Sequence, residues 1–124
     1  MNLQTKQQLN IIHNNGKIVD TKDVIPITHE FADQIYMRKM VMSKGQVVVG
    51  AEHKHEHVWF LLKGRVSIRE NNEIITHIAP CYTISKPGAQ RIILAHEESI
   101  FINIHKNPDN TKDIKELENQ IVNL

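Results

Sequence analysis

Short runs of β-forming residues follow one another through the middle of the chain, and each run ends at a turn signal. In the first run, Gln34–Met42, apolar side chains fall at alternating positions, which is typical of a strand with two different faces. Turn signals such as Lys44-Gly45 and Lys86-Pro87-Gly88 separate the runs. The other predicted strands span residues 46–49, 52–62, 65–69, 73–78, 81–85, 91–95 and 99–105. Many short strands predict an all-β sandwich or barrel and argue against an α/β fold.

The segments on either side of these strands follow other patterns. Residues 1–33 indicate a polar N-terminal arm and a wrapping segment, in which residues 17–27 form either an edge strand or a loop. In residues 107–124 apolar side chains recur at helical spacing, and Asn110 or Thr111 can cap the helix. The apolar stripe of this helix packs on its own barrel or against a second subunit, and we favour the barrel. We therefore expect a single domain made of the arm 1–33, the barrel 34–106 and the C-terminal helix 107–124.

Composition and charge exclude several classes of function. The chain has 124 residues, 40% of them hydrophobic, and a net charge of +1 without a basic block, which argues against a nucleic-acid partner. No apolar run is long enough to cross a membrane, and the polar segment Met1–Asn10 does not resemble a signal peptide. Cys81 is the single cysteine, so no internal disulfide can form. We expect a cytoplasmic protein.

A histidine-rich run, Glu52–Trp59, carries the main candidate chemistry. On a continuous strand His53, His55, His57 and Trp59 share one face, and neutral imidazole is a good ligand for transition metals. On a straight strand the outer two histidines lie roughly 13 Å apart, so all three bind one ion only if the strand bulges or twists. The alternative is a polar lining in which the imidazoles bond to one another, to glutamates or to water.

The glycines and turns around this run resemble the two sequence motifs of the cupin superfamily. The first motif has a glycine, five residues, His-x-His, three or four residues, a glutamate, six residues and a second glycine. Gly45 and Gly64 match the two glycines. The family's two histidine positions and its glutamate position are occupied, in this order, by Ala51, His53 and His57. His55 is an extra imidazole between them, so the skeleton of the motif matches better than its ligand set.

The second motif has a glycine, five residues, Pro-x-Gly, two residues, a histidine, three residues and an asparagine. Here Lys86-Pro87-Gly88 matches its core with the proline displaced by one position, and the glycine, histidine and asparagine positions hold Pro80, Arg91 and Ala95. The resemblance implies a cupin-type antiparallel jelly-roll β-barrel with a short C-terminal α-helix and the site inside the barrel. It also implies a homo-oligomer, with a dimer favoured.

Four further runs are similar to small cupin-like proteins encoded in tailed-phage genomes, which are mostly of unassigned function. They span residues 50–55, 61–66, 87–91 and 95–99. This second resemblance favours an accessory role over a metabolic enzyme. If the chain is phage-encoded, this resemblance implies a location in the host cytoplasm or in the virion.

Six residues are candidates for the site. We expect His53, His55 and His57 to hold a divalent transition metal, either Fe, Ni, Mn or Zn. We expect Arg91, Trp59 and Tyr36 to bind a small, anionic molecule, because an inward-facing guanidinium presents a planar donor fork to a carboxylate or phosphate. The alternatives are a salt bridge from Arg91 to Glu52, Glu97 or Glu98, a core position for Trp59 and a rim position for Tyr36. His105, at the end of the last strand, is expected at the surface or at the cavity mouth.

Three functions are compatible with these residues. The first is a metal-binding cupin with oxygenase, isomerase or metal-assisted hydrolytic chemistry, for which no catalytic side chain is assigned. The second is a non-catalytic barrel that binds a small ligand without metal. The third is a structural or phage accessory protein that uses the barrel as a rigid unit.

Overall fold

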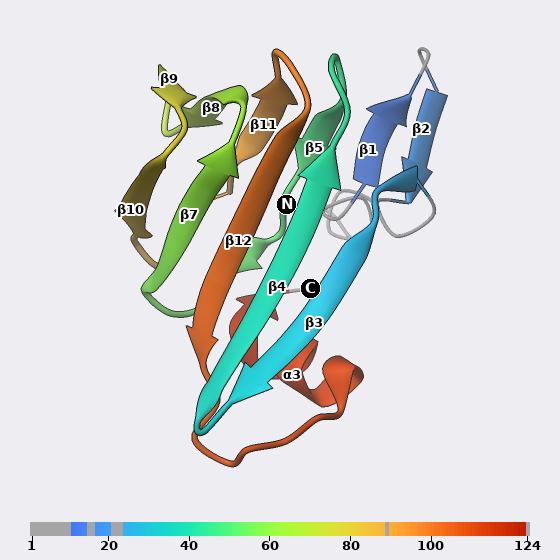
Figure 1. The fold of residues 1–124 in the computed structure, drawn as a ribbon. Helices are drawn as coiled ribbons and strands as arrows, with labels where there is room; N and C mark the ends of the chain where they lie inside the picture. Colours follow the sequence, from blue (N-terminus) through green and yellow to red (C-terminus); the bar gives the residue numbers. More distant parts are fainter. Residues whose placement is uncertain (1–10, 15–16, 21–23, 89, 124) are drawn as a thin grey trace.

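Two antiparallel β-sheets face each other in the computed structural model, which describes residues 11–14, 17–20, 24–88 and 90–123 (Figure 1). The five-stranded sheet, in front in Figure 1, has the order β10 (Cys81–Ser85), β7 (His57–Lys63), β12 (Ser99–Lys106), β4 (Ile35–Met42) and β3 (Ile27–Ala32). The six-stranded sheet has the order β2 (Lys17–Asp20), β1 (Ile11–Asn14), β5 (Val47–Val49), β11 (Ile92–Ala95), β8 (Arg65–Glu70) and β9 (Glu73–Ile78). A ribbon pairs β13 (Val122–Asn123) with β6 (Glu52–His53), and α3 (Ile114–Ile121) lies near one end of the sheets.

The predicted all-β fold is confirmed, and most predicted strands are found within one or two residues of their expected ends. The sheets also extend into the segment expected to wrap the barrel, because β1 pairs with β5 and β3 pairs with β4. Residues 1–10 of the predicted arm lie outside the described part of the chain. The predicted strand 52–62 is wrong, because it is divided into β6 and β7.

The core lies between the two sheets, where the inward-facing side chains of both meet. Strand alternation brings Leu61 and Phe101 of one sheet against Val66 and Ile68 of the other, and all four are buried. Gly64, between β7 and β8, has φ of +95°, and a Cβ at this position would clash with Ser99 Oγ and the carbonyl of Glu98. A glycine is therefore required at this turn.

The helix α3 covers one end of the barrel, as its apolar stripe predicted. Its buried side chains Leu117 and Ile121 pack with Tyr36 of β4 in a second small core. The expected cap at Asn110 or Thr111 is wrong, because the side chain of Asp113 accepts the hydrogen bond from the backbone N–H of Glu116 at 3.2 Å. Asn110 is engaged elsewhere, since its Oδ1 accepts from the backbone N–H of Gln34 at 2.6 Å.

Candidate metal centre

The histidine-rich run changes its pairing partners between residues 53 and 57. His53 in β6 lies opposite Val122 in β13, whereas β7 pairs with β10 and β12 of the five-stranded sheet. Between the two strands Lys54 is tied to the helix, because its backbone N–H donates to the carbonyl of Ile121 at 2.7 Å and its Nζ donates to the carbonyl of Asn119 at 2.5 Å. The chain therefore bends out of the strand direction at this point.

This bend brings together two of the three predicted ligands and leaves the third outside. The rings of His53 and His57 lie 4.4 Å apart between centroids, far closer than positions four apart on a straight strand. His55 is exposed on the loop between them and lies outside the cluster. The expectation that all three histidines share one strand face is wrong, because the strand does not continue through residues 54–56.

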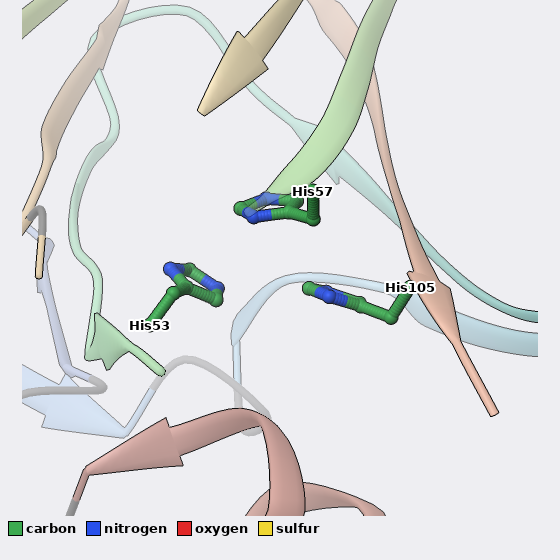
Figure 2. Close-up of side chains that lie close together, drawn as sticks. All are labelled: His53, His57 and His105. Atoms are coloured by element: carbon green, nitrogen blue, oxygen red, sulfur yellow. The ribbon is translucent and has the colours of Figure 1, made fainter. Parts of the chain in front are cut away.

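His105 of β12 takes the third place in the cluster. Its ring centroid is 4.4 Å from that of His57 and 5.5 Å from that of His53, and the side chain is buried. One candidate ligand atom from each of the three rings lies within 4.8 Å of the others, and Figure 2 shows the rings converging from three different strands. The sequence signal for this position was alternation, since Phe101, Asn103 and His105 fall on one face of β12.

Asn103, which the sequence analysis did not single out, sets the tautomer of His57. His57 Nε2 lies 2.8 Å from Asn103 Oδ1, and an amide oxygen can only accept, so Nε2 carries the proton and Nδ1 keeps its lone pair. That Nδ1 is buried and makes no hydrogen bond of good geometry with the described residues, although the backbone of His55 lies close enough to the ring to raise the pKa of His57, and His53 Nδ1 is likewise without a partner. A buried nitrogen without a partner, oriented by a second hydrogen bond, is the arrangement found in metal-binding histidines.

The three imidazoles are neutral near neutral pH, which is the form that binds metals. Burial, together with the positive charge of neighbouring groups, lowers the pKa of His53 to about 3 and that of His57 to about 4. Burial and the other two histidines lower the pKa of His105 to about 2. Ligand nitrogens around a tetrahedral metal lie about 3.3 Å apart. Small side-chain rotations would bring the three rings, whose ligand atoms already lie within 4.8 Å, to that spacing.

Arg91 lies beside this cluster and is only 4% exposed. Its Nη2 donates to Asn103 Oδ1 at 3.3 Å, while its Nη1 has no partner among the described residues. Nη2 is also 3.4 Å from His57 Nε2, but that nitrogen already donates to Asn103, so this contact is not a hydrogen bond. Burial lowers the pKa of Arg91 to about 10, against the opposing effect of the negative charge of Glu70, so the guanidinium stays protonated.

The salt bridge considered for Arg91 is not formed. Glu98 pairs with Lys63 at 3.0 Å, and within the part of the chain that the structure describes no carboxylate lies within salt-bridge distance of Arg91. The nearest polar partner of the guanidinium is therefore the neutral amide of Asn103. A buried cation without a charged partner is uncommon and costly.

A cavity of about 90 Å³ adjoins the histidines at the end of the barrel that α3 covers. Its lining includes Tyr36, Arg91, His53 and His105, so two of the three predicted ligand-binding residues are present. Tyr36 is 2% exposed, its hydroxyl is 2.7 Å from His29 Nδ1, and burial raises its pKa to about 12. Trp59 is not among the lining residues.

Trp59 belongs to the core instead. Its ring stacks on Phe101 with the centroids 4.8 Å apart, and it meets the edge of His77 at 4.9 Å. The side chain is 2% exposed, and the main core cluster includes it. The alternative role considered for Trp59, a core position, therefore describes its place in the structure.

Comparison with known proteins gives likenesses in structure only. No protein-family profile matches the sequence, and no curated protein matches it. A cupin superfamily protein from Desulfitobacterium hafniense superposes with a TM-score of 0.60 and 12% identity over 66% of this chain and 76% of that chain.

Two dioxygenases are also similar in structure. An acetylacetone dioxygenase from Acinetobacter johnsonii has a TM-score of 0.58 and 19% identity, over 66% of this chain and 59% of that one. A salicylate 1,2-dioxygenase from Pseudoaminobacter salicylatoxidans has a TM-score of 0.62 and 10% identity, over 78% of this chain and 27% of that one. At these identities the likeness concerns the arrangement of the strands. The chain has the cupin fold.

Proposed function

We propose that this chain is a metal-binding cupin in which His53, His57 and His105 hold one divalent transition metal beside a cavity for a small molecule. The observation that carries the proposal is the convergence of three imidazoles from three strands, those of His57 and His105 buried and that of His53 half-buried, with ligand atoms within 4.8 Å of one another. Two of these rings also present a buried Nδ1 that has no other partner among the described residues. Imidazole ligation is compatible with Fe, Ni, Mn or Zn.

Three protein ligands leave coordination positions open, and a metal bound there would supply Lewis-acid or redox chemistry to a molecule in the cavity. Asn103 would hold His57 in the tautomer that leaves Nδ1 free. The acetylacetone and salicylate dioxygenases with this fold support an oxygenase among the reaction classes, alongside isomerase and hydrolytic chemistry. The reaction itself is unassigned.

The test is the metal content of untagged protein, measured by mass spectrometry per chain. We expect near-stoichiometric metal in the parent and a loss of metal in His57→Ala and His105→Ala. His55→Ala is the matched control, because this neighbouring histidine is exposed and outside the cluster. A parent that holds no metal after incubation with Fe, Ni, Mn and Zn, or variants that bind it as well as the parent does, would overturn the proposal.

A second candidate function, a non-catalytic barrel that binds a small ligand without metal, has its own supporting observation. Ala51 and Arg91 occupy two positions where the family motifs have histidines, and Arg91 places a fixed positive charge beside the cluster. Such a charge opposes the binding of a cation. This function is favoured if the parent stays metal-free but small molecules raise its thermal midpoint.

We also propose that the chain forms a homodimer through the outer face of its five-stranded sheet. Alternation turns a continuous set of apolar side chains outward on β10, β7 and β12, here called the apolar outer face: Tyr82, Ile84, Val58, Phe60, Leu62, Ile100, Ile102 and Ile104. Tyr82 is 70% exposed, Ile84 55% and Leu62 50%. A contiguous apolar patch on a protein surface often marks a site of interaction with another molecule.

The size of this face suits a second copy of the chain. Three strands about 4.8 Å apart and about six residues long, with the outward side chains of β4 beside them, cover roughly 400 Å² in projection. That is about half of the roughly 800 Å² per partner in a standard interface, and neighbouring loops can supply the rest.

Among the described residues no helix is long and apolar enough to cross a membrane. The single cysteine supports a cytoplasmic location.

A further inference from the structure

The lining of the cavity carries more positive than negative charge. Arg38 and Arg91 contribute two guanidiniums, while Glu118 of α3 contributes the one carboxylate among the lining residues. The described residues form no salt bridge between Glu118 and either arginine. A cavity with this balance of charge attracts an anion.

Arg91 is the side chain best placed to hold that anion. More than nine-tenths of it is buried, it lines the cavity, and its Nη1 is a buried donor with no partner in the described part of the chain. Its Nη2 has only a 3.3 Å hydrogen bond to the neutral Asn103. Because the two Nη groups of a guanidinium match the two oxygens of a carboxylate, a bidentate pair would satisfy the donor that the protein leaves free.

We propose that the cavity binds a small carboxylate through Arg91, and that this carboxylate and the metal bind cooperatively. The proposal rests on the proposed function for its metal. The Arg91 Nη2 atom is 3.4 Å from His57 Nε2, and the Nδ1 of the same ring would hold the metal, so the guanidinium and the metal would repel each other across this one imidazole. A carboxylate bound to Arg91 in the cavity attracts both cations and offsets the repulsion, and by linkage each ligand then strengthens the binding of the other.

The size of the cavity limits the carboxylate. A cavity of roughly 150 Å³ is known to hold benzene, with its six carbon atoms. The cavity of about 90 Å³ next to Arg91 therefore accommodates about four non-hydrogen atoms, unless part of the ligand extends toward solvent. Acetate has this size and charge, and acetamide is a neutral molecule of nearly the same shape, so the two form a matched pair of probes.

The experiment measures the affinity of the full-length protein for Zn²⁺ by competition with a chromophoric chelator, in sodium acetate, in acetamide and in sodium chloride at equal ionic strength. We expect acetate to tighten Zn²⁺ binding by about tenfold or more, which is within the usual range of coupling between two ligands, and acetamide to have no effect. The binding of Zn²⁺ by free acetate acts in the opposite direction, so it cannot imitate this result.

Arg91→Met separates the anion site from general damage to the fold. Without the guanidinium we expect Zn²⁺ to bind at least as tightly as to the parent in chloride, and the effect of acetate to disappear. Arg91→Lys keeps the charge without the fork and should retain only part of the effect. If either variant fails to fold, the acetate and acetamide comparison on the parent still decides.

Two further outcomes distinguish this proposal from the metal site. Equal Zn²⁺ affinity in acetate and chloride, or an equal acetate effect in parent and Arg91→Met, overturns the carboxylate site while the metal site stands. If the parent binds no Zn²⁺, the proposed function fails, and the thermal midpoint of the metal-free protein in acetate becomes the test. A rise in the parent that is absent in Arg91→Met supports the carboxylate site, and no rise overturns it.

Discussion

The metal-free protein should lose much of its stability when the pH falls from about 7 to about 5. The reason lies in the histidine cluster, where burial and the charge of Arg91 lower the pKa of His57 to about 4, and burial, the other histidines and the arginines lower the pKa of His53 to about 3 and of His105 to about 2. In the unfolded chain the same side chains titrate near 6.5. Below that pH the unfolded state binds protons that the folded state does not, so the stability falls with the pH until the folded-state pKa values are reached.

The size of the loss follows from the same values. Each histidine costs about 1.4 kcal/mol for every pH unit below its unfolded pKa, so a fall to about pH 5 costs about 2 kcal/mol per histidine and about 6 kcal/mol for the three. A domain of this size typically has about 5–15 kcal/mol of stability in total, so a loss of about 6 kcal/mol removes from roughly two fifths of it to all of it. The carboxylates contribute little in this range, because their ordinary pKa values are about 4.

The assay is urea unfolding of chelator-treated protein at several pH values, followed by circular dichroism. His105→Gln removes one of the three groups and should reduce the loss by about 2 kcal/mol. His55→Gln is the matched control, because this exposed side chain lies outside the cluster and should leave the loss as in the parent. An unfolding free energy that changes by less than about 1 kcal/mol over this pH range would refute the lowered pKa values of the three imidazoles.

Three further predictions address the surroundings of the site. Asn103→Ala should weaken metal binding by about 10- to 100-fold, because His57 loses the partner that sets its tautomer. Asn103→Asp keeps an acceptor oxygen and should retain most of the metal affinity. Chelator competition measures the affinity of both variants, and affinities equal to that of the parent in both would contradict this role of Asn103. Phe60 lies on the apolar outer face, and Phe60→Asp should convert the expected dimer into a monomer. Size-exclusion chromatography with light scattering measures the mass, and an unchanged mass would place the interface elsewhere. Gly64→Ala should lower the free energy of unfolding, measured by heat or urea, by about 3 kcal/mol or more. Gly45 has a similar φ but no atom near its Cβ position, so Gly45→Ala should lower it by about 1 kcal/mol. Equal losses in the two variants would contradict the steric argument.

Most strands could be predicted from the sequence because their alternation and turn signals are local. The runs 73–78 and 81–85, for example, form β9 and β10 with the expected ends. The division between β6 and β7 could not be predicted in this way. It arises because His53 pairs with Val122, from the other end of the chain, while His57 lies in the five-stranded sheet. Only the tertiary arrangement shows that the two residues belong to one cluster with His105 and that His55 lies outside it.

The third histidine was missed for a different reason, which is the reversed polarity of β12. Its outward side chains are Ile100, Ile102 and Ile104, whereas Asn103 and His105 face inward. The usual expectation of apolar residues inside and polar residues outside therefore assigns His105 to the wrong face. Pairing with β4 sets the true orientation, since His105 lies opposite the buried Tyr36. Under the proposed functions a strand of this polarity would meet two demands, an interior that binds a polar ligand or metal and an exterior that another chain covers. The two demands are separable, because loss of metal in His105→Ala tests the interior and dissociation of the dimer tests the exterior.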